Sequence, residues 1–168
     1  MVRRLFLILI VVFVIYYFSI KPPEIKQPLN FNHKSHTDLL IECIACHRNA
    51  EEQRDAGIPN IETCSLCHNP ENTPLWNITS HSLKGYIAEK RQIPWERIYR
   101  VKDHTLFSHR RHTGIARIDC RVCHGAVTEM TESIIRPFIE FSKQRGMNNC
   151  VDCHKKEKVV TDCLMCHR

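Results

Sequence analysis

The chain has 168 residues, ten of them cysteine, and a formal net charge of +6. This length corresponds to one ordinary domain. The basic residues form no run interleaved with aromatic residues, and the sequence has neither a glycine-rich phosphate loop nor zinc-finger spacing, which excludes the common nucleic-acid-binding and nucleotide-binding classes.

The N-terminal segment predicts a membrane anchor. Residues Leu5–Ile20 are uncharged and largely apolar, and they follow Arg3 and Arg4. A helix over them would span about 24 Å, close to the ~30 Å of a bilayer core, so residues 1–20 are assigned to a single transmembrane helix. A cleavable signal peptide is the alternative, although no small-residue cleavage site follows.

The two arginines orient this anchor. They predict a cytoplasmic N-terminus in the inner membrane, with the rest of the chain on the periplasmic side. Residues 21–30 contain three prolines and are expected to form a stalk. The functional domain is then expected over 31–168.

All ten cysteines lie in five copies of Cys-x-x-Cys-His. This spacing is typical of c-type haem attachment, in which two thiols form thioethers with one haem and the adjacent imidazole binds its iron. A single copy could also be a zinc ribbon, a redox dithiol or part of a disulfide framework. Five copies with no cysteine left over favour five covalently bound haem c groups, with these thioether cysteines and proximal iron ligands: Cys43, Cys46 and His47; Cys64, Cys67 and His68; Cys120, Cys123 and His124; Cys150, Cys153 and His154; Cys163, Cys166 and His167.

Five haems leave about thirty residues for each, too few for a conventional core. The expected fold is therefore mostly irregular chain with short α-helices wrapped around the haems. Helical spacing appears in Ser80–Gln92, with Ser80 as N-cap and Pro94 ending the helix, and in Val127–Arg145, which Pro137 kinks or restarts. Haem propionates would offset most of the positive charge.

A second motif is duplicated. Phe31–Thr37 reads F-x-H-x-x-H-T, and Phe107–Thr113 repeats this pattern about 76 residues later. Each copy precedes one Cys-x-x-Cys-His motif, and further copies of the haem motif follow. The sequence thus predicts two repeated units, about 31–70 with two haems and about 107–168 with three.

Six of the eleven histidines lie outside the haem motifs. Each low-spin haem needs a second axial ligand, and imidazoles three residues apart can serve two different haems. The expected distal ligands are therefore His33, His36, His109 and His112. His104 is the choice for the fifth haem, with His81 and Met147 as alternatives.

An F-x-H-x-x-H motif ahead of closely spaced haem motifs resembles the class III multihaem cytochromes, the cytochrome c3-like group, over about 31–168. The resemblance implies that the first histidine of each pair binds the nearest following haem and the second a later one. Relatives with three haems carry a histidine four residues before the middle motif, where this chain has Gly146. The implied partners are His33 for Cys43–Cys46, His36 for Cys64–Cys67, His109 for Cys120–Cys123, and His112 for Cys150–Cys153 or Cys163–Cys166.

The anchor, the five haem motifs and Ile93–Val101 together resemble a narrower group. These are the membrane-anchored multihaem subunits of alternative complex III and of related periplasmic quinone reductase complexes. The resemblance implies an electron relay between quinone-linked partner subunits and a soluble cytochrome or periplasmic reductase, with the menaquinone or ubiquinone pool as a further partner.

Two histidine ligands on each iron leave no open coordination position, which favours electron transfer in a respiratory chain over catalysis. The alternative is a quinol dehydrogenase that feeds a periplasmic reductase. It would need a quinone pocket and a proton-accepting carboxylate, for which Asp38 and Glu42 lie near the first haem motif. A high-spin haem enzyme is a third interpretation, against which the six additional histidines argue.

Overall fold

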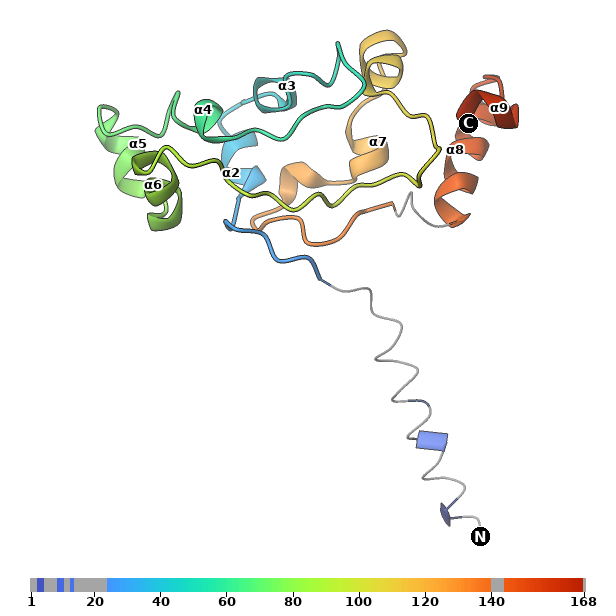
Figure 1. Ribbon diagram of the computed structural model, residues 1–168, viewed down its shortest axis with the longest axis horizontal. Helices are drawn as coiled ribbons and strands as arrows, with labels where there is room; N and C mark the ends of the chain where they lie inside the picture. The colour runs from blue at the N-terminus through green and yellow to red at the C-terminus, as the bar shows by residue number, and fades with distance from the viewer. Residues whose placement is uncertain (1–2, 5–8, 11–12, 14–23, 140–143, 168) are drawn as a thin grey trace.

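The computed structural model describes residues 3–4, 9–10, 13, 24–139 and 144–167. In 24–139 and 144–167 the chain is mostly irregular, with short helices joined by extended segments (Figure 1). The α-helices are α2 (His33–Thr37), α3 (Cys43–Cys46), α4 (Ile61–Cys64), α5 (Thr73–Ile78), α6 (His81–Ala88), α7 (Arg121–His124), α8 (Gln144–Lys156) and α9 (Cys163–Cys166), with a π-helix η1 (Arg110–Ile115) and a 3₁₀ helix η2 (Val127–Glu129).

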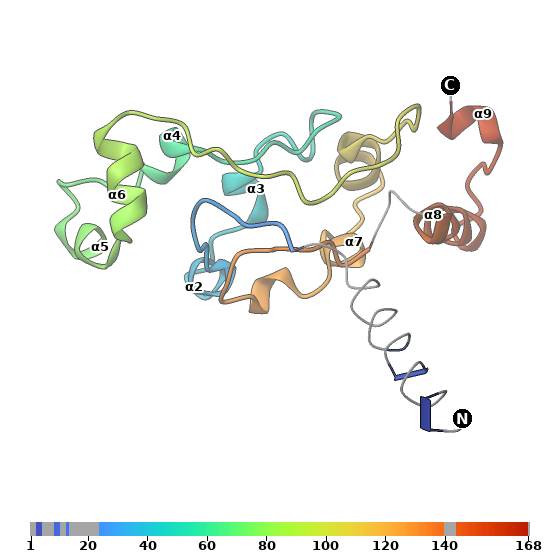
Figure 2. The same ribbon diagram turned by 60° about the horizontal axis from the view of Figure 1, so that its bottom comes forward.

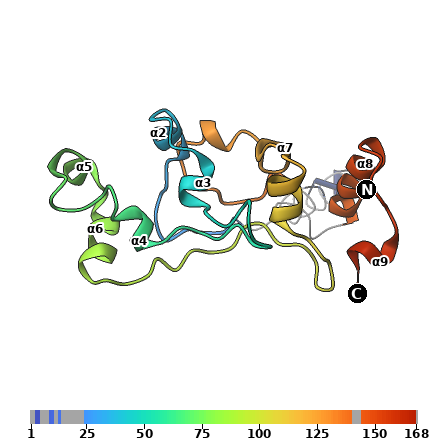
Figure 3. The same cartoon turned by 90° about the horizontal axis from the view of Figure 1, so that it is seen from above.

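The helices form an elongated row rather than a layered domain. Figures 1, 2 and 3 agree that α5 and α6 lie at one end, followed by α4, α3 and α7, with α8 and α9 at the other end. The only β-pairing among the described residues is an isolated antiparallel bridge between Thr105 and His167.

The described residues bury very little apolar surface. The buried apolar side chains are those of Leu29, Ala50, Ile61 and Ile93. Many large apolar side chains remain exposed, and several occupy the two variable positions of the haem motifs, such as Leu66, Val122 and Leu164. Large exposed apolar surface marks a place where another group binds.

Residues 24–31 lie alongside the chain that leads into α8. The Ile25 amide donates to the Ile135 carbonyl at 3.1 Å, and the Ser133 hydroxyl donates to the Leu29 carbonyl at 2.6 Å. Arg136 and Glu24 add an ion pair at 2.9 Å. These contacts hold residues 133–136 extended against the start of the domain.

This pairing explains a difference from the sequence-based expectation. The helix expected over Val127–Arg145 is wrong through residue 139, where the structure has only the short η2 before irregular chain. Backbone groups there bond to residues 25–31 instead of to their own helix. The other helix was correctly expected with Ser80 as N-cap, but it ends at Ala88 rather than at Pro94, since Lys90 adopts a positive φ of 49°.

The predicted transmembrane helix requires a correction. Where the structure describes the chain, it contains no helix with the length and apolar character needed to cross a bilayer. Leu5–Ile20 supplies 16 residues, fewer than the about 20 that a bilayer core requires, and most of the segment lies outside the described residues. The fold over the described residues is thus that of a small domain of short helices and irregular chain.

Candidate haem sites

Each haem motif is organised by a single helical turn. The amide of the motif histidine donates to the carbonyl of the first cysteine, at 2.8 Å for His47, 2.9 Å for His68 and 3.0 Å for His124. His167 repeats the contact at 2.9 Å, and the fourth motif lies inside α8. Residues three apart on a helix share a face, so both thiols of a motif can reach one ligand. All ten thiols are free.

Burial affects the cysteine thiols. Burial raises the pKa of five cysteine thiols above the ordinary value, since a thiolate is poorly solvated in a buried position. Neutral thiols with raised pKa values are less reactive toward disulfide exchange than exposed thiolates. The cysteines whose pKa burial raises are Cys46, Cys64, Cys120, Cys123 and Cys150.

Three of the expected distal histidines face a motif histidine directly. The ring centroids of His36 and His68 lie 6.1 Å apart. The corresponding separation is 6.3 Å for His109 and His124, and 6.1 Å for His112 and His154. In each of these three pairs, a histidine from outside the haem motifs thus lies at nearly the same distance from a motif histidine.

This distance fits an iron between the two rings. Two imidazoles that each bind one metal ion through a ring nitrogen at ~2 Å have ring centres about 6 Å apart. In direct van der Waals stacking the rings would be closer. The three pairs thus match the residues that a six-coordinate haem iron requires.

Hydrogen bonds orient six of the imidazoles expected to bind haem iron, and they do so through the same nitrogen. Nδ1 lies within 3.2 Å of an oxygen in each case, and this contact assigns the proton to Nδ1 and leaves Nε2 for a metal. The oxygens belong to Asn32 for His36, Gly57 for His47, Thr79 for His68, Arg54 for His109, Ser108 for His112 and Val160 for His154.

The two F-x-H-x-x-H motifs adopt the same local geometry. The Phe31 ring lies edge-on to His33, with centroids 4.7 Å apart, and stacks on His36 at 4.6 Å. Phe107 repeats both contacts, edge-on to His109 at 4.9 Å and stacked on His112 at 4.7 Å. The phenylalanine of each motif therefore holds both imidazoles of its own motif in place.

His33 is the first residue of α2 and is partly buried. Burial, with smaller effects of neighbouring His47 and His36, lowers the pKa of His33 to about 4. Its Nδ1 is buried without a hydrogen-bond partner among the described residues. A neutral, half-buried imidazole of this kind is suited to binding a metal, because only the neutral ring can donate a lone pair. Burial likewise lowers the pKa of His124 to about 4.

The fifth motif has a more open environment. His167 is exposed, and so is His104. The two segments nevertheless touch, because Thr105 pairs with His167 and the Leu106 amide donates to the Cys166 carbonyl at 2.7 Å. His104 has a positive φ of 65°, an uncommon conformation outside glycine.

The two alternatives for this ligand lie elsewhere. His81 is exposed on the first residue of α6, at the opposite end of the row (Figure 1). Met147 is 46% exposed on α8, one helical turn before Cys150. Neither is brought to His167 by a described contact, so backbone proximity favours His104.

Two supporting residues have no signal in the sequence. The Thr79 hydroxyl accepts from Nδ1 of His68 at 2.6 Å while donating to the Leu75 carbonyl at 2.7 Å. The Tyr99 ring lies edge-on to His124, with centroids 4.4 Å apart, and its hydroxyl accepts from the Phe138 amide at 3.0 Å. Thr79 lies far from any motif, whereas Tyr99 falls within Ile93–Val101, whose sequence alone assigns it no role.

Comparison with known proteins agrees with this geometry. Residues 18–92 match the model of the class III cytochrome c family, and residues 105–168 match that of cytochrome c7 and related cytochromes c. Both matched stretches contain one F-x-H-x-x-H motif and the haem motifs that follow it. The two matches support a multihaem cytochrome c that resembles the class III group, with electron transfer rather than catalysis as its role.

One relative points to a particular kind of multihaem cytochrome. The chain is 27% identical over 169 aligned positions to the multiheme cytochrome c subunit of menaquinone reductase from Nitratidesulfovibrio vulgaris Hildenborough. The alignment covers 85% of this chain and 77% of that protein. This chain resembles a cytochrome subunit of a quinone reductase.

Proposed function

We propose that this chain carries five covalently bound haem c groups and relays electrons within a quinone-linked respiratory complex. The observation that carries the proposal is the set of three imidazole pairs with ring centroids 6.1–6.3 Å apart. Bound haem c would supply a reversible Fe(III)/Fe(II) couple, and histidines on both axial positions would leave no site for substrate.

The proposed ligand pairs follow from the contacts. His36 pairs with His68, His109 with His124, and His112 with His154, which makes the fourth motif the partner of His112. His33 is assigned to His47, because the resemblance to class III cytochromes implies that the first histidine of each pair binds the nearest following haem. His104 is the partner of His167, because the chain segments next to both are hydrogen-bonded.

Burial supports the first four pairs independently. Eight of the eleven histidines are partly buried, and they are the eight members of these pairs. The other three, His81, His104 and His167, are exposed. A chain without a haem function would have little reason to draw eight titratable rings out of water, since burial disfavours their charged form.

The partner assignment rests on the relative, whose name places it in a menaquinone reductase. We propose by analogy that this chain exchanges electrons with quinone-linked subunits of such a complex and with a soluble electron carrier. Because c-type haem is attached outside the cytoplasm, the domain would work on the periplasmic side.

Two measurements test this function. The intact mass of the purified protein should equal the polypeptide plus five haem groups, with low-spin spectra throughout; a smaller number of haems would contradict the ligand assignment. Affinity purification of the tagged chain from its source should recover quinone-linked subunits. Reduction of the isolated chain by a quinol analogue would instead make it a quinol dehydrogenase.

A further inference from the structure

The two repeated units dock reciprocally. In the second unit, the amides of His109 and Arg110 donate to the carbonyls of Arg54 and Gln53, both at 2.9 Å. The Thr113 hydroxyl donates to the Ala50 carbonyl. The helix that carries the histidine pair of the second unit therefore lies on residues 50–54, directly after the first haem motif.

The histidine helix of the first unit makes the equivalent contact in return. The Lys34 amide donates to the Met130 carbonyl at 2.9 Å, and the Thr37 hydroxyl donates to the Thr128 carbonyl at 3.1 Å. The Lys34 ammonium lies 3.7 Å from the Glu129 carboxylate. Thus α2 lies on η2, directly after the third haem motif, and each histidine helix contacts the other unit.

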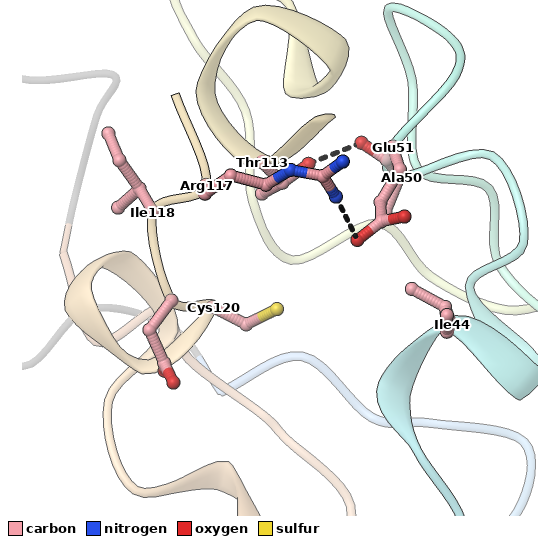
Figure 4. Close-up of a pocket in the computed structure, with 8 residues that line it drawn as sticks. Ile44, Ala50, Glu51, Thr113, Arg117, Ile118 and Cys120 are labelled. Atoms are coloured by element: carbon pink, nitrogen blue, oxygen red, sulfur yellow. Dashed lines mark hydrogen bonds and ion pairs between the residues drawn. The ribbon is translucent and has the colours of Figure 1, made fainter. Parts of the chain in front are cut away.

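This exchange brings the first and third haem motifs together. Ile44 of the first motif and Cys120 of the third line one common space. A cavity of about 220 Å³ lies between the two motifs, lined by Ile44 on one side and Ile118 on the other (Figure 4). The Arg117 guanidinium and the Glu51 carboxylate, 3.5 Å apart, join its two walls.

The two histidines of each F-x-H-x-x-H motif indicate where the second and fourth haem motifs lie relative to this junction. His33 and His36 share α2, so the first and second motifs are neighbours. His109 and His112 share one turn at η1, so the third and fourth motifs are neighbours. Figures 1, 2 and 3 show α4, α3 and α7 in this order along the row, with α8 and α9 together at its end.

We propose that the haem motifs are ordered in space as second, first and third, with the fourth and fifth together at the far end, and that the first and third meet at the junction made by reciprocal docking. This inference rests on the proposed function. The order differs from that in the sequence, because each unit begins at the junction and extends away from it. Electrons that pass between the two halves of the array would then cross this junction.

Gly114 is the residue that permits the close approach. A Cβ atom at this position would lie 2.0 Å from the Glu51 carbonyl oxygen, a backbone atom that cannot move aside as a flexible side chain would. The first unit has Asp38 at the equivalent position after its F-x-H-x-x-H-T motif. Gly85 offers a matched control, since no atom lies within 4 Å of a Cβ built there.

The test is nuclear magnetic resonance of the fully reduced holoprotein, with haem-to-haem nuclear Overhauser effects assigned by motif. We expect effects between haems of the first and third, first and second, and third and fourth motifs, and none between the second and third. In Gly114→Ala the first-to-third effect should be lost while the two effects within units remain. Gly85→Ala should retain all of them.

The outcomes separate the two proposals. Fewer than five haems by mass would contradict the proposed function. Five haems with an effect between the second and third motifs, or with no first-to-third effect in the wild type, would overturn the inference alone. A first-to-third effect retained in Gly114→Ala would overturn the role given to Gly114. If Gly114→Ala binds fewer haems, Thr113→Val provides a milder disruption, and the wild-type effects by themselves still decide the order.

Discussion

The imidazole rings of His109 and His124 face each other almost in parallel, with 12° between their planes and 6.3 Å between their centroids. His109 precedes η1 and His124 ends α7. The planes of His112 and His154 differ by 29°, and those of His36 and His68 by 56°. The three histidine pairs thus differ in the angle between their ring planes. In a haem with two histidine ligands, this angle governs the splitting of the iron d orbitals.

His109→Ala should convert one low-spin haem of the holoprotein to high spin, because it removes one of two axial ligands. The lost electron paramagnetic resonance component should be the most rhombic one, since nearly parallel imidazoles separate the d orbitals most strongly. Arg111→Ala, an exposed residue on the same helix, is the control and should leave the spectrum unchanged. An unaltered spectrum in His109→Ala would rule out this ligand.

Thr79→Val should raise the reduction potential of one haem. The Thr79 hydroxyl accepts the Nδ1 proton of His68, which makes that imidazole a stronger donor and favours ferric iron. Loss of one such hydrogen bond corresponds to ~1 kcal/mol, or about 40 mV for one electron. Redox titration checks this shift. Thr128→Val, whose hydroxyl contacts only the Glu129 side chain at 3.5 Å, should show no comparable change.

His104→Ala should make the haem of the Cys163–His167 motif high-spin. The backbone contact between Leu106 and Cys166 brings His104 near this motif, whereas His81 lies at the far end of the row. His81→Ala is therefore the matched control and should remain fully low-spin. A high-spin haem in His81→Ala, with His104→Ala unchanged, would make His81 the ligand. If both variants remain low-spin, Met147 would be the ligand.

Gly125→Ala should destabilise the domain by ~2 kcal/mol or more. Gly125 has φ 70° and ψ −157°, a region that only glycine adopts readily. A Cβ atom would also lie 2.7 Å from the Phe138 ring. Thermal unfolding of the holoprotein measures the effect. Gly85→Ala, within α6, should instead be neutral or stabilising by up to about 1 kcal/mol.

The chain without haem should show no cooperative unfolding transition. Among the described residues only Leu29, Ala50, Ile61 and Ile93 are buried apolar side chains, far too few to offset the conformational entropy of ordering the chain. Replacing all ten cysteines by serine and following circular dichroism on heating tests this. A sharp melting transition in that variant would show that the protein core suffices on its own.

The sequence predicted the elements whose signal is local. The Cys-x-x-Cys-His motifs each need only one helical turn, and the structure forms that turn at Cys43, Cys120 and Cys163. The Ser80 N-cap was predictable for the same reason, because its hydroxyl bonds to an amide three residues away. The helix predicted over residues 127–145 was wrong through residue 139, because apolar spacing within a segment does not reveal competing contacts with residues 25–31.

Other features required the tertiary structure. The pairing of His112 with His154, left open between two motifs by the sequence, depends on contacts between segments about 40 residues apart. Thr79 and Tyr99 reach their histidines only through the folded chain. The order of the motifs is likewise decided by reciprocal docking, since backbone hydrogen bonds between distant segments leave no periodic trace in the sequence.

Residue types and short spacings in the sequence show which cysteines can attach haem and which histidines are available, because thioether formation and iron ligation depend on both. The folded chain is needed to show which histidine faces which motif, and why Gly114 must be glycine where the first unit has Asp38. These depend on the close approach of two backbones, and close packing between distant segments is a property of the folded chain alone.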